Sequence, residues 1–362
     1  MVYLPNSIYV DRVGLKTHFG HQILSRFSET DIIVIDNPQK YVINDRAGDL
    51  THGKKSLYLK YFPSDAFKLC PGFSQGVLCC RYYVLDLMEN CPLECTYCIL
   101  QAFLNRSVIT FHVNVEELVE KMVKSIRENP HRSFRIGTGE HSDSLALDSI
   151  FQVNPYLVET FSKLTNATLE LKTKTDAVSP LIGLNHNQNT VIAWSLNPVE
   201  IVRYHELKTA SLNDRLKAAQ RVINDGYKVA FHFDPVIYYG DWRKGYRETI
   251  EMMSDMIPAK EIAWISLGTL RYIPELKKIA EERFPALSIF SNEFTAAHDG
   301  KMRYIKPIRK MLIGSISGWI RKRLPKVPLY ICMEKSAVWQ KTMTVRPKNA
   351  EELELYLSTG RS

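Results

Sequence analysis

The stretch YYVLDLMENCPLECTYCILQ, Tyr82 to Gln101, holds three of the seven cysteines of the chain. Cys91, Cys95 and Cys98 stand in a C-x3-C-x2-C spacing, after the apolar run Tyr82–Met88. Thiolates this close along the chain can converge on one metal centre. A structural zinc site usually needs four protein ligands, and a cubane iron–sulfur cluster usually takes four cysteines. A tight triplet therefore indicates a 4Fe-4S cluster in which one iron stays open.

An open iron can hold a small molecule. With the aromatic Tyr97 just before the last cysteine, the spacing resembles the radical adenosylmethionine enzymes. In those enzymes S-adenosyl-L-methionine is cleaved by one electron to a carbon radical, so that the cofactor carries the hard chemistry. The alternative is a zinc knuckle that takes a fourth ligand from elsewhere, such as Cys80 or His112.

Composition limits the class of protein. The 362 residues are enough for one large core or two modest domains. No apolar run has the length of a membrane span, and the start MVYLPNSIYVDRVG lacks the pattern of a signal peptide. We therefore expect a cytoplasmic protein without membrane contact. The formal net charge of +8 favours a polyanion such as nucleic acid as partner.

Three segments follow one another along the chain. Residues 1–80 read as an N-terminal α/β extension, with a helix over Val13–Phe27, a buried strand over Asp31–Ile35 and a further strand over Ser56–Phe62. Residues 81–285 form the central segment. Residues 286–362 form a C-terminal region, with a helix through about Lys322 and a strand over Val327–Cys332. Its basic residues are Lys301, Arg303, Lys306, Arg309, Lys310, Arg321, Lys322, Arg323 and Lys326.

In the central segment, apolar strand-like runs alternate with amphipathic helices. The strands expected are Tyr82–Met88, Ser133–Gly137, Thr168–Thr173, Thr190–Leu196, Lys228–Asp234 and Glu261–Ser266. The helices expected between and after them are Val115–Glu128, Tyr156–Leu164, Asp176–Leu181, Ser211–Asp225, Tyr246–Met256 and Ile273–Arg283. Such alternation implies parallel strands joined by right-handed crossovers. The fold class is therefore α/β, a partial (β/α)6 TIM-type barrel, with its chemistry at the carboxyl ends of the strands.

Polar residues stand at those strand ends. The second strand is followed by Gly137 and Gly139, which would let backbone approach a ligand, and then by Glu140, Ser142 and Asp143. The other candidates are Lys174, Ser195 and Asp234, at the ends of the third, fourth and fifth strands. His232 shares the parity of Asp234, and a histidine within a strand is more often a satisfied core residue. A small-residue loop at Gly268–Thr269, with Arg271 behind it, could also admit a ligand.

Together these pieces resemble the spore photoproduct lyase family. The matching motifs are ENCPLECTYCILQ, EHSDSLALD, LELKTKTD, WSLNP, GYKVAFHFDPVIYYGDW and SLGTLRY, spread in order over residues 82–272. The resemblance implies that a cluster on the three cysteines cleaves the cofactor to a 5′-deoxyadenosyl radical, which takes hydrogen from a thymine dimer lesion in DNA. The crosslink then breaks and hydrogen is returned.

The resemblance also implies roles for single residues and partners. Ser142, Lys174 and Ser195 would contact the cofactor, beside Glu140, Asp143 and Asp234, and Tyr97 would be a catalytic aromatic of the pocket. Lys174 would pair with the methionine carboxylate. DNA would bind through the basic C-terminal region, and a reductant such as flavodoxin or ferredoxin would supply electrons.

Two departures from the family pattern concern the return of hydrogen. The lyases carry a donor cysteine where this chain has Glu140, and a tyrosine where it has Ile99. Three hypotheses follow. The chain is a DNA-lesion lyase with another hydrogen donor, or a radical enzyme for a nucleotide, RNA or small molecule, or an iron–sulfur protein that binds DNA or carries electrons without catalysis.

Overall fold

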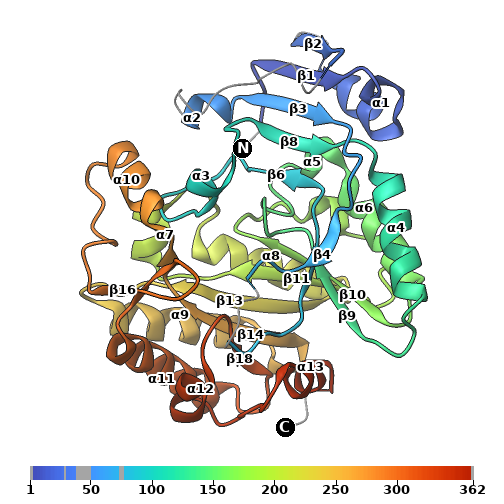
Figure 1. Cartoon of the computed structure of the whole chain (residues 1–362). Coiled ribbons are helices and arrows are strands. Elements are labelled where there is room, and N and C mark those ends of the chain that lie inside the picture. Colours follow the sequence, from blue (N-terminus) through green and yellow to red (C-terminus); the bar gives the residue numbers. More distant parts are fainter. Residues whose placement is uncertain (1–2, 28–29, 38–49, 73–76, 360–362) are drawn as a thin grey trace.

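The computed structural model describes residues 3–27, 30–37, 50–72 and 77–359. Figure 1 shows a main sheet across the centre, a smaller N-terminal sheet at the top and the C-terminal helices at the bottom. Among the helices of the described residues, none combines the length and the apolar character that crossing a bilayer requires.

The main sheet has eight strands, and its order explains the partial barrel. Five central strands, β9, β10, β11, β13 and β14, pair in parallel, each with the next. β5 pairs in parallel with β9, and β18 pairs in parallel with β14. Only β4 is antiparallel. In spatial order the strands are β18 (Leu329–Ile331), β14 (Ile262–Thr269), β13 (Lys228–Val236), β11 (Thr190–Ser195), β10 (Ala167–Thr173), β9 (Phe134–Gly137), β5 (Tyr83–Leu85) and β4 (Phe67–Leu69).

The helices of the central segment contact the apolar face of this sheet, because each follows its strand through a crossover. α6 packs on β10, and α8 packs on β11 and β13. The longer helices are α4 (Val115–Arg127), α6 (Val153–Ser162), α8 (Leu212–Asn224), α9 (Trp242–Met256), α10 (Pro274–Arg283), α11 (Lys306–Arg323) and α13 (Ala350–Thr359). The shorter ones are α1 (His18–Leu24), α2 (Leu50–Gly53), α3 (Leu100–Phe103), α5 (Asp148–Phe151), α7 (Val199–His205) and α12 (Ser336–Thr342).

Three smaller sheets complete the described part of the fold. The N-terminal sheet has the order β2 (Asp31–Ile35), β1 (Ser7–Asp11), β3 (Ser56–Lys60), β8 (Ile109–His112) and β6 (Met88–Glu89). Two strands pair across the cluster loop, β7 (Glu94–Cys95) and β12 (Glu206–Leu207). The third sheet has the order β15 (Arg271–Tyr272), β17 (Met302–Tyr304) and β16 (Phe294–Ala296).

The predicted α/β partial barrel is confirmed, and all six predicted strands have counterparts. Tyr82–Met88 is divided between β5 and β6, which belong to different sheets. Val13–Phe27 and Asp176–Leu181 are mostly not α-helical. The first holds a 3-10 turn and the short α1, and the second only a 3-10 turn at Ser179–Leu181. Gly14 and Gly20 weaken a helix in the first segment. The second segment is six residues long and contains Pro180, which disfavours a helix interior.

No prediction from the sequence covers β1 or β8. The strand at Asp31–Ile35 is present, but the expectation that it is buried is wrong, because most of its residues are exposed or half-buried. β8 lies after the cluster segment and belongs to the N-terminal sheet, where it pairs with β3 and with β6. The division at residues 80 and 285 stays a proposal. β4 and β18 lie outside the central segment and still pair with its strands, so the flanks take part in the main sheet.

Alternation within the strands gives the main sheet a polar inner face. In β10 the side chains of Leu169 and Leu171 are fully buried in the apolar core, whereas Glu170 and Lys172 carry charge to the other face. Glycine is required on that face in β9. A Cβ atom at Gly137 would lie 1.6 Å from the hydroxyl oxygen of Tyr82. The expectation that Gly137 makes room for a ligand is therefore wrong, because the protein's own tyrosine fills the space.

Gly137→Ala should lower the free energy of unfolding by about 1–3 kcal/mol, the usual cost of overpacking a rigid core. Urea unfolding followed by circular dichroism measures it. Gly318→Ala is the control, since Gly318 is an exposed residue in α11 with nothing within 4 Å of the added Cβ. The control should be neutral or slightly stabilising, because alanine favours a helix over glycine. Equal effects of the two substitutions would contradict the packing described.

Candidate active site

The three cysteines lie in a loop between β6 and α3, and backbone contacts fix its course. Asn90 has a φ of 69°, a left-handed conformation that asparagine tolerates. Its side chain accepts a hydrogen bond from the Cys91 amide at 3.0 Å. Cys95 is in β7 and pairs with Glu206 of β12. The amide of Thr96 donates to the carbonyl of His205 at 2.9 Å. The loop is thus attached to the end of α7.

A buried carboxylate holds the outer side of this loop. Glu94 is 2.7 Å from the guanidinium of Arg283 in α10 and 3.4 Å from the ammonium of Lys54. Arg283 also donates to the side chain of Gln101, whose amide nitrogen donates to the Cys95 carbonyl at 3.1 Å. Segments far apart in the sequence therefore fix one loop, and its conformation depends on the complete fold.

Cys91 and Cys95 are buried, and Cys98 is half-buried. Burial raises the pKa of the Cys91 thiol to about 12, against the opposing charge of Lys54. Burial also raises the pKa of Cys95 well above its ordinary value, against the charge of Lys174. Thiols must lose their protons to bind a metal. The two cations beside them are suited to balance part of the negative charge of a thiolate-bound cluster.

A cluster on the three cysteines remains a prediction. No group of three His, Cys, Asp or Glu side chains among the described residues is close enough to share one metal ion. A cubane places each thiolate on a different iron, so its ligands need not meet at one point. The zinc alternative is not supported. Cys80 accepts a hydrogen bond from Arg135 at 2.9 Å, and His112 contacts the Asp86 carbonyl at 2.9 Å.

A cavity of about 530 Å³ opens beside the cluster loop, at the carboxyl ends of the main-sheet strands. Tyr97 and Cys98 line it from the loop. Glu140 lines it from the segment after β9, Asp234 from near the end of β13, and Arg271 from β15. The structure therefore brings the loop and two of the predicted strand-end carboxylates into one space. Such a space is where a parallel α/β barrel places its chemistry.

The segment after β9 is tied to the cluster loop. Ser142 donates to the Asn90 carbonyl at 2.7 Å, and the Asn90 amide donates to the His141 carbonyl at 2.8 Å. Glu140 lies 3.7 Å from the ammonium of Lys172 and is about one-third exposed to the cavity. Of these residues, Glu140 and His141 line the cavity.

Asp143 organises the same segment from within. One of its carboxylate oxygens accepts hydrogen bonds from the amides of Leu145 and Ala146 and from the hydroxyl of Thr173, at 2.7 to 3.0 Å. The other accepts from the Lys174 amide at 2.8 Å. A contact between Asp143 and a cofactor would have to replace one of these bonds. Its role as a cofactor ligand remains a prediction.

Tyr97 and Lys174 meet at a buried carboxylate that the sequence analysis did not single out. Glu206 accepts a hydrogen bond from the Tyr97 hydroxyl and lies 3.1 Å from the Lys174 ammonium. Its second oxygen is 2.7 Å from Arg215, which also donates to the Ser195 carbonyl at 2.8 Å. Burial would raise the pKa of Glu206, but the charges of Lys174 and Arg215 outweigh it and hold the pKa well below the ordinary value.

No sequence signal pointed to Glu206. It is one charged residue in the polar stretch between α7 and α8 and follows no predicted strand. It connects the cluster loop with the ends of β10 and β11. The predicted residues Tyr97, Lys174 and Ser195 therefore lie in one neighbourhood, although the cofactor contacts proposed for them remain predictions.

Asp234 forms a two-point ion pair with Arg271, at 2.8 and 3.0 Å. Burial would raise the pKa of Asp234, but the charge and hydrogen bonds of Arg271 outweigh it and lower the pKa. A Cβ atom at Gly268 would lie 2.6 Å from the Asp234 carboxylate. The glycine in this loop therefore accommodates Asp234, and the expectation that it admits a ligand is wrong.

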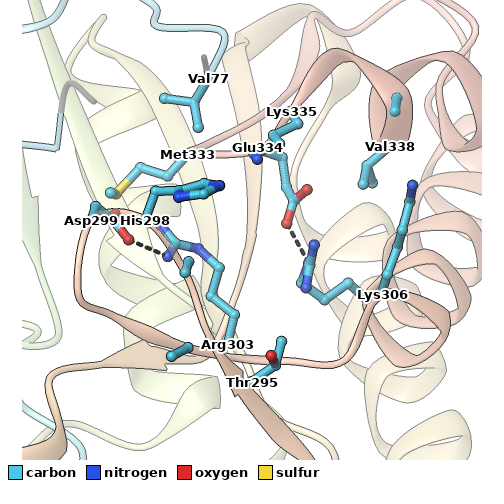
Figure 2. A pocket seen from close by; sticks show the side chains of 14 residues that line it. Val77, Thr295, His298, Asp299, Arg303, Lys306, Met333, Glu334, Lys335 and Val338 are labelled. Carbon is cyan, nitrogen blue, oxygen red and sulfur yellow. Dashed lines mark hydrogen bonds and ion pairs between the residues drawn. The ribbon is translucent and has the colours of Figure 1, made fainter. Parts of the chain in front are cut away.

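A second cavity, of about 920 Å³, adjoins the first and shares Asp299 and Met333 with it. Figure 2 shows Asp299 joined to Arg303 on one side of this cavity, with Glu334 and Lys306 on the other. It lies between the strand β16, the start of α11 and the segment after β18. Part of the basic C-terminal region thus borders the candidate active site directly.

A polar network fills the barrel interior, further from the carboxyl ends of the strands than the cavities are. The Nε2 atom of His232 is 2.5 Å from Glu170, and its Nδ1 atom is 2.6 Å from the Ser266 hydroxyl. The Arg135 guanidinium is 3.8 Å from the second oxygen of Glu170. The interpretation of His232 as a satisfied core residue is confirmed. Burial would raise the pKa of Glu170, but the charge of His232 and its hydrogen bond outweigh this and lower the pKa to about 2.

Comparison with known proteins agrees with this geometry. A partial barrel with a three-cysteine loop at the carboxyl ends of its strands defines the class of radical adenosylmethionine enzymes. The family model described as spore photoproduct lyase matches residues 3–306. The chain therefore belongs to the spore photoproduct lyase family, and this membership favours an enzyme over the non-enzymatic alternative.

Named relatives and solved structures extend the likeness over most of the chain. The spore photoproduct lyase of Clostridium acetobutylicum is 25% identical over 260 residues, 70% of this chain and 75% of the relative. That of Bacillus subtilis is 21% identical over 299 residues, 80% and 85% of the two chains. A mutant spore photoproduct lyase with bound AdoMet and dinucleoside spore photoproduct has a TM-score of 0.80 at 20% identity, covering 92% of this chain and 99% of that one.

Glu170→Gln should lower the free energy of unfolding at pH 7 by about 3–5 kcal/mol, because it leaves His232 and Arg135 without their buried counter-ion. The folded pKa of about 2 lies below the ordinary 4.5. The Glu170 carboxylate therefore contributes its full stabilisation above about pH 4.5. This contribution to the free energy of unfolding is lost as the pH falls toward 2.

Urea unfolding between pH 7 and the acid limit of the native state measures both effects. The variant should lose less stability than the wild type on acidification. Glu128→Gln, at an exposed site, is the control and should follow the wild type. An identical acid dependence of Glu170→Gln and wild type would contradict the network.

Proposed function

We propose that this protein is a radical adenosylmethionine lyase that cleaves a thymine dimer lesion in DNA. One observation carries the proposal: Tyr97 and Cys98 of the cluster loop line the same cavity as Glu140 and Asp234 from the strand ends. Membership of the family supports it. So does the fold shared with a lyase structure that holds both AdoMet and a dinucleoside spore photoproduct.

Cys91, Cys95 and Cys98 would hold a 4Fe-4S cluster, and S-adenosyl-L-methionine would lie beside it. When bound, the pair supplies one-electron cleavage to a carbon radical. The residues of the chain would bind and orient the cofactor. Glu140 offers a carboxylate to the methionine ammonium, and Lys174 offers an ammonium to its carboxylate.

The remaining predicted residues would support this binding. Ser142 and Asp143 fix the segment after β9, and Ser195 adds a hydroxyl at the end of β11. Asp234, held by Arg271 at 2.8 Å, presents a fixed charge to the cavity. Tyr97 presents its ring to the cavity while Glu206 holds its hydroxyl. A reductant such as flavodoxin or ferredoxin would deliver the electron.

Part of the basic C-terminal region is neutralised within the protein. Arg303 pairs with Asp299, Arg309 with Glu334, and Arg323 with Asp255. The cations of this region without an acidic partner among the described residues are therefore the lysines and Arg321, which donates to two carbonyls and to the Tyr356 hydroxyl. Lys310 loses protons more readily than usual, because partial burial and the like charges of Lys341 and Lys306 lower its pKa. A cationic face without internal compensation suits the phosphates of DNA.

A radical enzyme with a different substrate is the second candidate. Glu140 favours it, because a carboxylate stands where the lyases carry a donor cysteine and cannot give up a hydrogen atom in the same way. A nucleotide, RNA or small molecule would then occupy the cavity in place of the lesion.

The decisive assay is anaerobic. Protein with a reconstituted cluster should, with dithionite and S-adenosyl-L-methionine, form 5′-deoxyadenosine, and a synthetic dinucleoside spore photoproduct should be converted to two separate thymidines. Liquid chromatography with mass spectrometry follows both products. Formation of 5′-deoxyadenosine with an intact lesion would favour the second candidate.

Cys95→Ala gives the matched test of the site. Loss of one ligand of three should abolish cluster binding, measured as iron and sulfide per chain, and cofactor cleavage. Cys79→Ala is the control, because Cys79 accepts a hydrogen bond from the Arg81 amide at 3.4 Å and lines neither cavity. A Cys95→Ala variant with a full cluster and normal cleavage would overturn the assignment of the three cysteines.

DNA binding has its own prediction. Lys306→Gln combined with Lys310→Gln should weaken binding to a fluorescent DNA duplex and reduce the steepness with which affinity falls with salt, by about 0.9 in slope per lost phosphate contact. Anisotropy titrations between about 50 and 200 mM salt measure it. Lys322→Gln with Lys326→Gln is the control, because both lysines are exposed and neither lines one of the two cavities, whereas Lys306 does. A greater loss of DNA affinity in the control variant than in the Lys306 and Lys310 variant would show that DNA binds elsewhere.

A further inference from the structure

A histidine at the wall of the cavity takes no part in the proposed binding of the cofactor. His141 follows Glu140 in the segment after β9, and both residues line the cavity beside the cluster loop. The His141 carbonyl accepts a hydrogen bond from the Asn90 amide at 2.8 Å. The backbone at this position is therefore tied to the cluster loop, and the imidazole borders a space that a substrate would fill.

One edge of this imidazole is held by a buried carboxylate. The Nδ1 atom of His141 is 2.8 Å from Asp86, whose side chain is 7% exposed. Lys68 of β4 pairs with the second oxygen of the same carboxylate. The Nε2 atom of His141 makes no hydrogen bond or ion pair with another described residue. Asp86 therefore fixes the ring through one nitrogen and leaves the other nitrogen available to a ligand.

An aromatic side chain stacks on the same imidazole. The ring of Phe103, at the end of α3, lies against that of His141, with centroids 5.8 Å apart and planes 24° apart. Phe103 also lines the cavity, and it is 53% exposed, although phenylalanine is among the residues most often buried. Part of its ring is thus open to a ligand. Further apolar surface of this cavity comes from Pro71, Ile99, Leu100, Leu270 and Ile273.

The charges around His141 favour its protonated form. Burial lowers the pKa of His141, but the hydrogen bond and the charge of Asp86 outweigh burial and raise the pKa above the ordinary 6.5. Lys68 opposes this rise and Glu140 adds to it, whereas Phe103 on the side of α3 is uncharged. Both nitrogens of the protonated ring donate hydrogen bonds. In the neutral ring the proton stays on Nδ1 beside Asp86, so that Nε2 can only accept.

An open aromatic ring beside one cationic donor suits a nucleobase. The face of a base stacks on an aromatic side chain whatever its sequence, and the carbonyl oxygens at the edge of a pyrimidine accept hydrogen bonds. A phosphate suits this position less, because the carboxylate of Glu140 lies in the same wall and like charges repel. The observations therefore favour the base of a substrate over its backbone.

We propose that His141 donates a hydrogen bond from Nε2 to a pyrimidine carbonyl of the lesion and that Phe103 stacks on the same base, an inference that rests on the proposed lyase function. Asp86 is a positioning residue in this arrangement, because it acts only through His141. Together the two rings hold one base of the lesion at the wall that also carries Glu140.

The affinity for the dinucleoside spore photoproduct, which contains no phosphate, tests this contact. Isothermal titration uses protein with a reconstituted cluster and S-adenosyl-L-methionine but no reductant, so that no turnover occurs. At pH 6, His141→Phe should weaken binding about 10- to 100-fold, the worth of a hydrogen bond from a charged donor. Phe103→Ala should weaken it about 5- to 100-fold. His131→Phe and Tyr204→Ala, at exposed sites that line neither of the two cavities, are the matched controls and should bind as the wild type does.

The pH dependence of binding separates this contact from a general effect on the fold. The affinity of the wild type should fall about tenfold or more as the pH rises through the raised pKa of His141, because Nε2 then loses its proton. His141→Gln keeps an uncharged donor, so its affinity should not depend on pH in this way. Asp86→Asn should move the fall in affinity to lower pH, because the charge that raises the pKa of His141 is removed.

Three outcomes are decisive. Equal affinity of His141→Phe and wild type at every pH would overturn the contact while the lyase function stands. A loss of affinity seen only with the phosphate-linked dinucleotide would also overturn it, because His141 would then bind the backbone. A wild type that cleaves the cofactor but neither binds nor repairs the lesion would instead overturn the proposed function, and this contact with it.

Discussion

The Glu206 carboxylate connects the parts on which this site depends. It is fully buried and contacts Tyr97 of the cluster loop, Lys174 at the end of β10, and Arg215 of α8. A buried carboxylate costs several kcal/mol unless it is paired and hydrogen-bonded. Its partners are therefore held to it, and the loop, two strand ends and a helix keep one arrangement. The candidate active site is in this sense a consequence of satisfying one buried charge.

The cavity itself is built by the flanks as much as by the barrel. Gly72 comes from the segment before the cluster loop, and Asp299, Lys301 and Met333 come from the C-terminal region. β18 adds a seventh parallel strand to the six expected, so the chain after it, with Met333, arrives at the same edge as the other strand ends. The basic region is thereby adjacent to the cavity, which suits a substrate that is one part of a long polyanion.

Much of this could be predicted. The cysteine spacing is local, and the strand-end positions of Lys174 and Asp234 follow from strand parity, which a sequence displays directly. The expectations drawn from two glycines were wrong for a physical reason. Gly137 and Gly268 do mark close approach, but the approaching groups are Tyr82 and Asp234 of the protein itself. A sequence shows that a Cβ is absent, and it does not show which atom uses the space.

The sequence by itself determined the α/β alternation, the three-cysteine loop after the first barrel strand and the absence of a cysteine at position 140. These are features of residues near one another along the chain. Only the tertiary structure decided that Glu206 binds Tyr97, 109 positions away, that β4 and β18 join the main sheet, and that Glu140 and Asp234 line one cavity with Tyr97. Such contacts arise because buried charges and unpaired strand edges must find partners, and the partner is chosen by the packing of the whole fold.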